Sequence, residues 1–159
     1  NRNDRYPGDR QKWDSILTVI VPDRFAWGFG SDDMHNLDKD IGISWNVVIV
    51  PKLTSELVRQ ALEQGCFFFV NSPQGHGGSP APVIEAITVD APSGTIHIKA
   101  SGHERIEWIS RGRIVRRGDR LRLAALPKQA QYVRAEISGA DGTVVGTQPF
   151  GITRLESPD

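Results

Sequence analysis

A break in local composition at residues 71–82 constrains the fold of this chain more than any other feature. These twelve residues hold three Pro, three Gly and two Ser, a composition typical of a loop or linker. Helical and strand patterns alternate before the break, whereas only short alternating strands are indicated after it. The sequence therefore predicts two units, residues 1–80 with helices and strands and residues 83–155 built from strands.

The first unit begins with an amphipathic helix, which Pro22 would end. An apolar run at 25–30 then predicts a short buried strand, and a β-branched run at 45–50 predicts a second strand that is covered on both faces. Four apolar residues at helical spacing indicate the first helix: Trp13, Ile16, Leu17 and Ile20.

A second helix is predicted over residues 51–65, and a third strand over 66–70. Thr54 is a good N-cap for this helix, and Gly65 is placed to end it in the left-handed conformation. Strand, helix and strand in this order predict a parallel crossover unit.

The second unit shows seven short strand patterns separated by turn signals such as Arg111-Gly112 and Asp141-Gly142. This spacing is typical of a small antiparallel β-sandwich of the immunoglobulin-like kind. The predicted strands cover residues 84–89, 96–100, 105–109, 113–116, 120–124, 132–138 and 143–147.

The formal net charge of zero favours neither nucleic acid nor an anionic membrane as a partner. No apolar run approaches the ~20 residues that a membrane-spanning helix needs, so no membrane partner is expected. Seven arginines within residues 103–122 could bind phosphate or a polyanion, but their alternation on short strands is more typical of a solvated face. Aromatic residues are not interleaved among them as in a stacking surface, so no nucleic-acid partner is expected.

The run Ser-Asp-Asp-Met-His at residues 31–35 is the strongest indication of chemistry. Asp33 and His35 follow a predicted strand and can turn toward one point, where a carboxylate oxygen and an imidazole nitrogen suit Zn²⁺, Mn²⁺ or Fe. The alternative is an Asp that caps a turn and a His that bonds to backbone. Asp32 could orient His35 as an outer acceptor or could cap the turn. His76, in a Gly-rich loop, could reach the site or could belong to a linker.

Several of these segments, taken in order, resemble the C-terminal end of a PHP (polymerase and histidinol phosphatase) metallohydrolase. The likeness rests on Trp13-Asp14-x-x-Leu17, on residues 27–35, on Leu53-Thr54 and on Ala61-Leu62-x-x-Gly65-x-Phe67-Phe68. Residues 84–152 are similar to a β-domain that some family members append after the barrel.

This resemblance implies a metal-dependent phosphoesterase with a small phosphorylated substrate. It makes Asp33 and His35 two ligands of a di- or trinuclear centre and leaves the catalytic residues unknown. The family's His-x-His pair has no counterpart among the four histidines, which are His35, His76, His97 and His103. The resemblance therefore implies that the other ligands lie upstream of this chain, so that the fragment alone is expected to be inactive and to bind metal weakly or not at all.

The fold expected from these observations is α+β: a partial (βα) barrel-like layer over residues 1–80, followed by a small antiparallel β-sandwich over 83–155. Strands of an incomplete barrel would leave an exposed edge, which predicts self-association. The alternative function is a non-catalytic β-sandwich module that binds a carbohydrate, a protein or a partner domain.

Overall fold

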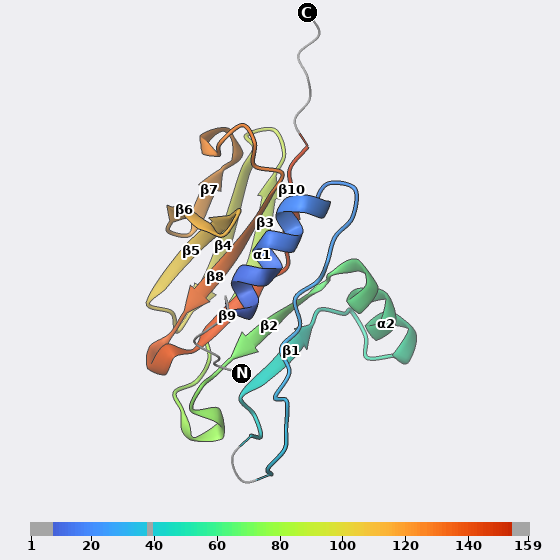
Figure 1. Cartoon of the computed structure of the whole chain (residues 1–159), viewed down its shortest axis with the longest axis vertical. Coiled ribbons are helices and arrows are strands. Elements are labelled where there is room, and N and C mark those ends of the chain that lie inside the picture. Colours follow the sequence, from blue (N-terminus) through green and yellow to red (C-terminus); the bar gives the residue numbers. More distant parts are fainter. Residues whose placement is uncertain (1–7, 38–39, 154–159) are drawn as a thin grey trace, which may run out of the picture.

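The computed structural model describes residues 8–37 and 40–153, which form two helices and ten strands in two antiparallel sheets (Figure 1). An α+β fold is thereby confirmed. None of the helices in these residues is long and apolar enough to cross a membrane. The elements are α1 (Asp9–Ile20), β1 (Ser44–Val48), α2 (Ser55–Gln64), β2 (Phe67–Asn71), β3 (Val83–Asp90), β4 (Thr95–Ser101), β5 (Arg105–Ser110), β6 (Arg113–Arg117), β7 (Arg120–Arg122), β8 (Tyr132–Ser138), β9 (Val144–Thr147) and β10 (Phe150–Gly151).

The larger sheet has the strand order β1-β2-β9-β8-β5-β6, with β10 pairing with β8, and the smaller sheet has the order β3-β4-β7. Side chains from both sheets form one core that includes Ile98 of β4, Trp108 of β5 and Val145 of β9. Two antiparallel sheets that share a core are consistent with a β-sandwich. A strand is present at each of the seven segments predicted between residues 84 and 147.

The predicted parallel crossover is wrong, because β1 and β2 pair antiparallel from Ser44 opposite Asn71 to Val48 opposite Phe67. The α2 segment leaves the end of β1 and returns at the same end, so β2 runs back along β1. The described residues show no (βα) barrel layer here. Strands from the two predicted units also pair with each other, since β2 is hydrogen bonded to β9. The larger sheet thus contains strands from both sides of the predicted boundary at residues 80–83.

The second helix, predicted over residues 51–65, is observed over Ser55–Gln64 with the predicted N-cap and terminating glycine. The Thr54 side chain accepts a hydrogen bond from the backbone N–H of Leu57, and Gly65 ends the helix with a φ of 74°. Figure 1 shows α2 projecting from the side of the molecule beyond β1 and β2.

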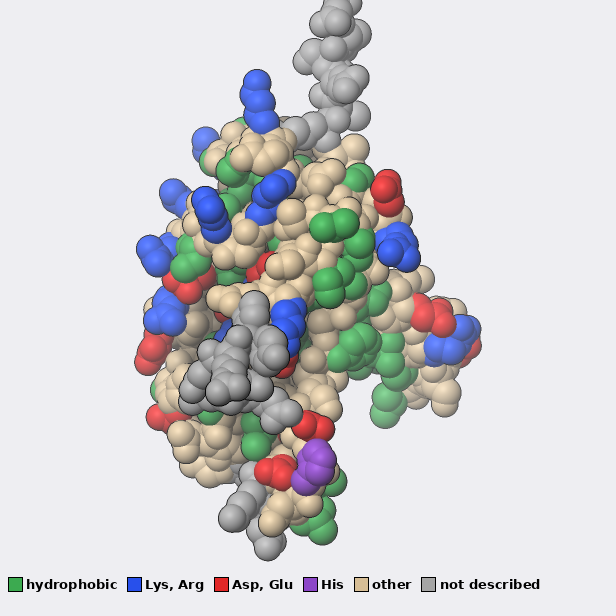
Figure 2. Space-filling view, in the orientation of Figure 1, with side chains coloured by type: hydrophobic (Ala, Val, Ile, Leu, Met, Phe, Trp, Pro, Cys, Tyr) green, Lys and Arg blue, Asp and Glu red, His purple; other side chains and the backbone are tan. Residues whose placement is uncertain are grey.

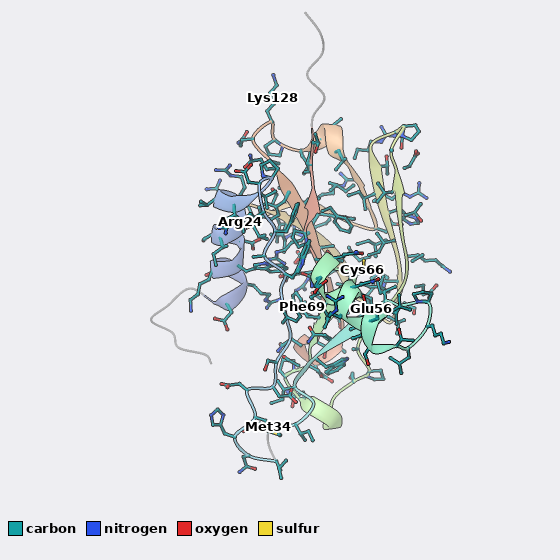
Figure 3. All side chains as sticks on the ribbon, turned by 90° about the vertical axis from the view of Figure 1, so that its right-hand side faces the viewer. Arg24, Met34, Glu56, Cys66, Phe69 and Lys128 are labelled. Carbon is teal, nitrogen blue, oxygen red and sulfur yellow. The ribbon has the colours of Figure 1, made fainter. Side chains whose placement is uncertain are left out.

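Helix α1 covers the other face of the larger sheet, opposite the smaller sheet, where Leu17 packs against Tyr132 of β8 (Figure 3). Below this helix lies a buried ion pair between Asp14 and Arg134, which are 3% and 2% exposed. The Arg134 Nε and Nη2 donate to the two carboxylate oxygens of Asp14 at 2.9 and 2.6 Å, and the Tyr132 hydroxyl donates to the same carboxylate at 2.9 Å. Arg134 Nη1 also donates to Glu136 at 2.6 Å. This network fixes α1 to β8.

The apolar run at 25–30 forms no strand, so that prediction is wrong. Side-chain amides take the place of a neighbouring strand: Gln148 bonds to both the N–H and the C=O of Gly28, and Asn46 does the same for Gly30, at 2.8–2.9 Å. The backbone lies close to its neighbours, because a Cβ on Gly28 would stand 2.8 Å from the Trp13 ring. This extended segment leads directly into the loop that carries Asp33 and His35.

Candidate functional site

The residues predicted to bind metal lie in the loop between the extended segment and β1, at the end of the molecule where Figure 3 labels Met34. The Asp32 carboxylate closes this loop by accepting hydrogen bonds from the backbone N–H groups of Gly42 at 2.8 Å and Ser44 at 2.6 Å. The Asp40 carboxylate accepts from the N–H groups of His35 and Asn36 at 3.0 and 2.7 Å. Two carboxylates therefore hold the backbone of the loop.

Asp33 and His35 are both exposed at the tip of this loop. Asp33 has a φ of 49°, a left-handed conformation that Asp tolerates better than most side chains. The His35 Nδ1 lies 2.6 Å from the backbone carbonyl oxygen of Asp33. A carbonyl oxygen can only accept a hydrogen bond, so Nδ1 carries the proton in the neutral ring and the lone pair lies on Nε2. Neutral imidazole held in this way is the form that ligates metals.

The other predicted residues differ in their surroundings. Asp32 accepts hydrogen bonds across the loop, from the backbone N–H groups of Gly42 and Ser44, and the acceptor at His35 Nδ1 is the Asp33 carbonyl. The backbone of His76 lies in a single 3₁₀ turn, Gly75–Gly77, and its side chain lies outside what the structure describes. His97 is on β4, and its Nε2 is 3.1 Å from an Asp119 carboxylate oxygen.

Within residues 8–37 and 40–153, no three or more His, Cys, Asp or Glu side chains are grouped so that they could hold a metal ion. The loop nevertheless offers donors that fit a divalent cation, namely the exposed carboxylate of Asp33 and Nε2 of His35. A complete centre would need ligands in addition to these two.

The sequence did not single out the buried network under α1. Burial and the neighbouring Asp14 carboxylate raise the pKa of Tyr132 to about 12. Burial would lower the pKa of Arg134, but its bonds to Asp14 and the charge of Glu136 raise it above the ordinary value. The signal available in the sequence was an arginine at position 134 between apolar neighbours on a strand, where a charge is expected to be paired.

Comparisons of this chain with protein families, with curated proteins and with solved structures found no match.

Proposed function

We propose that the chain is the C-terminal part of a PHP-type metal-dependent phosphoesterase, in which Asp33 and His35 supply two ligands to a divalent cation. The proposal rests on the ordered sequence resemblance described above and on one structural observation. That observation is the 2.6 Å contact between His35 Nδ1 and the Asp33 carbonyl, which places the ring lone pair on Nε2, the atom that would ligate. In this proposal, the other ligands of the metal ion lie outside residues 8–37 and 40–153.

A cation bound there would lower the pKa of a coordinated water and polarise the phosphoryl oxygens of a small phosphorylated substrate. The chain's own residues hold that position. Asp33 contributes a negative charge, and His35 contributes a neutral donor whose ring orientation is fixed by its bond to backbone. Asp40 holds the N–H of His35, while Asp32 ties the loop to the start of β1. Because β1 and β2 are antiparallel, residues 44–71 contribute no pair of parallel barrel strands in this proposal.

The test is hydrolysis of a generic phosphodiester, bis(p-nitrophenyl) phosphate with added Mn²⁺, by the protein expressed from its complete reading frame. Asp33→Ala and His35→Ala are expected to lower the rate by at least roughly a hundredfold, since a lost ligand impairs the cation site itself. His97→Ala is the matched control, because it removes another His, partly exposed, that lies near an Asp. Rates in the Asp33 and His35 variants equal to that of the control would refute the assignment.

A second candidate is a non-catalytic module that binds a carbohydrate, a protein or a partner domain. The observation that favours it is an apolar edge: β1 is the last strand of the larger sheet, and Trp45, Val47 and Ile49 at this edge are 38%, 36% and 56% exposed. Apolar side chains at an open sheet edge are typical of an interaction surface. Under this alternative, Asp33→Ala and His35→Ala would not change the binding of a carbohydrate, a protein or a partner domain.

A further inference from the structure

A cavity of about 580 Å³ lies beside the buried network, far from the Asp33–His35 loop. Its walls are α1, the β5–β6 hairpin around its tip, and three residues of the segment before β8, namely Pro127, Gln129 and Ala130. Figure 3 labels Lys128 and Met34 at opposite ends of the molecule, so the 127–130 wall and the metal loop are well separated. The volume is within the range of pockets that enclose small organic ligands.

The charge in this cavity is positive. Asp14 lines its wall, but that carboxylate is neutralised by the buried guanidinium of Arg134. The two other charged residues of the lining are Arg111 and Arg113. Neither forms an ion pair with a carboxylate among the residues that the structure describes, and the Arg111 guanidinium makes a long bond of 3.4 Å to the Gln129 carbonyl. Two guanidinium groups with no carboxylate partner among those described residues favour a phosphate or a carboxylate as ligand.

The hydroxyl groups of the lining point to a second property of the ligand. Ser15, Thr18 and Ser110 each donate their hydroxyl hydrogen to a backbone carbonyl, at 2.9, 2.7 and 2.6 Å. Each oxygen therefore retains lone pairs that can only accept from a ligand. A ligand that carries hydroxyl groups as well as an anionic group would satisfy both parts of the lining.

The position of Arg111 is fixed by the fold. Arg111 and Gly112 have φ values of 53° and 70°, as in a two-residue hairpin turn that favours Asn or Gly at its first position. The Arg111 N–H donates to the Tyr132 hydroxyl at 3.0 Å, and that hydroxyl donates to Asp14. The buried network thus anchors the hairpin tip that presents the guanidinium.

We propose that this cavity binds a small polyhydroxylated anion, a sugar phosphate or a sugar acid, through Arg111 and Arg113. The cavity is half open, and its limited volume fits a small ligand better than a polymer. A polyanion would instead lie along the Lys and Arg side chains that Figure 2 shows over the β5–β7 side of the molecule. On that surface Arg116 and Arg122 are exposed and lie outside the cavity lining. The proposal is independent of the proposed phosphoesterase activity, because the two sites share no residue.

The experiment is a titration of the ¹⁵N-labelled chain, followed by NMR, with four separate probes: glucose 6-phosphate, glucuronate, glucose and a heparin oligosaccharide. The Arg111 and Gly112 amides are expected to shift with glucose 6-phosphate or glucuronate and not with glucose. Arg111→Gln and Arg113→Gln should each weaken that binding roughly tenfold, as expected for loss of a charge-assisted hydrogen bond. Arg116→Gln is the matched control and should leave the affinity unchanged.

Three results would overturn the proposal. The first is the absence of any shift at the hairpin tip with either anionic sugar. The second is equal weakening by Arg116→Gln, or heparin binding that depends on Arg116, because either would assign the arginines to a polyanion surface. The third is binding of glucose as strong as that of its phosphate. Unchanged circular dichroism spectra of the variants ensure that a lost shift reports on binding, since Arg111 and Arg113 are exposed side chains.

Discussion

Replacing Asp14 by Asn should destabilise the protein strongly, because it leaves a guanidinium buried without its main counter-ion. Arg134 is 2% exposed and donates hydrogen bonds to the Asp14 carboxylate at 2.9 and 2.6 Å. The Asn side chain keeps the shape of Asp but replaces one acceptor oxygen by an NH₂ group, which would face an N–H donor of Arg134. The fold would then hold a partly unpaired charge below α1.

Breaking a buried pair by removing one partner costs about 3–5 kcal/mol of the free energy of unfolding. The lower end, about 3 kcal/mol, is expected here because Arg134 retains its bond to Glu136 at 2.6 Å. With a urea dependence of about 2 kcal/mol per molar, the unfolding midpoint would fall by roughly 1.5 M. The double variant Asp14→Asn with Arg134→Met should recover part of this loss, because it also removes the buried charge.

The assay is equilibrium urea unfolding followed by tryptophan fluorescence, for which Trp108 is a fully buried reporter. Glu56→Gln on α2 is the matched control. Glu56 also accepts from an arginine, Arg59 at 2.8 Å, but both side chains are 59% exposed. The midpoint of the control should stay within error of the parent protein. A midpoint for Asp14→Asn equal to that of the control would refute the claim that the buried pair holds α1 to the sheet.

Four further predictions follow from the same structure. The raised pKa of Tyr132 means that its hydroxyl holds its proton more tightly in the native state than in the unfolded state. The stabilising effect of Tyr132 is therefore complete below pH 10 and is lost as the pH rises to about 12. In urea unfolding, the free energy of unfolding of Tyr132→Phe should fall less over that interval than that of the parent protein. Gly28→Ala should lower the free energy of unfolding by about 1–3 kcal/mol, because its Cβ would stand 2.8 Å from the Trp13 ring. Gly77→Ala is the control: no atom lies within 4 Å of its Cβ, so the urea midpoint should not change. Two-dimensional imidazole NMR should show neutral His35 with its proton on Nδ1; a proton on Nε2 would remove the structural support for metal binding. Sedimentation at high protein concentration should show self-association that Val47→Lys weakens; a monomer under the same conditions would count against the apolar edge as a contact.

Local signals in the sequence were sufficient for the elements that depend on their own residues. Helix α2 begins after Thr54 and ends at Gly65, because a side-chain cap and a left-handed glycine act within one turn of the chain. The turn signal Arg111-Gly112 likewise predicted the hairpin between β5 and β6, in which both residues have positive φ values.

Features that depend on distant partners could not be predicted in the same way. The run at 25–30 has the composition of a strand, but its backbone bonds go to the side-chain amides of Gln148 and Asn46. The antiparallel pairing of β1 with β2 depends on where α2 returns the chain, and strand–helix–strand order alone does not fix that direction. At the candidate site, the sequence indicated Asp33 and His35, but the bond that sets the His35 tautomer depends on the backbone of Asp33.

The most direct test of the proposed function is the metal content of the protein expressed from its complete reading frame, measured by plasma mass spectrometry after purification. The proposal predicts a bound Zn, Mn or Fe ion whose occupancy falls at least roughly tenfold in Asp33→Asn and in His35→Gln. His97→Gln, the control with a comparable Asp neighbour, should retain the metal. Full metal occupancy in the Asp33 and His35 variants would contradict the assignment of this loop as a metal site.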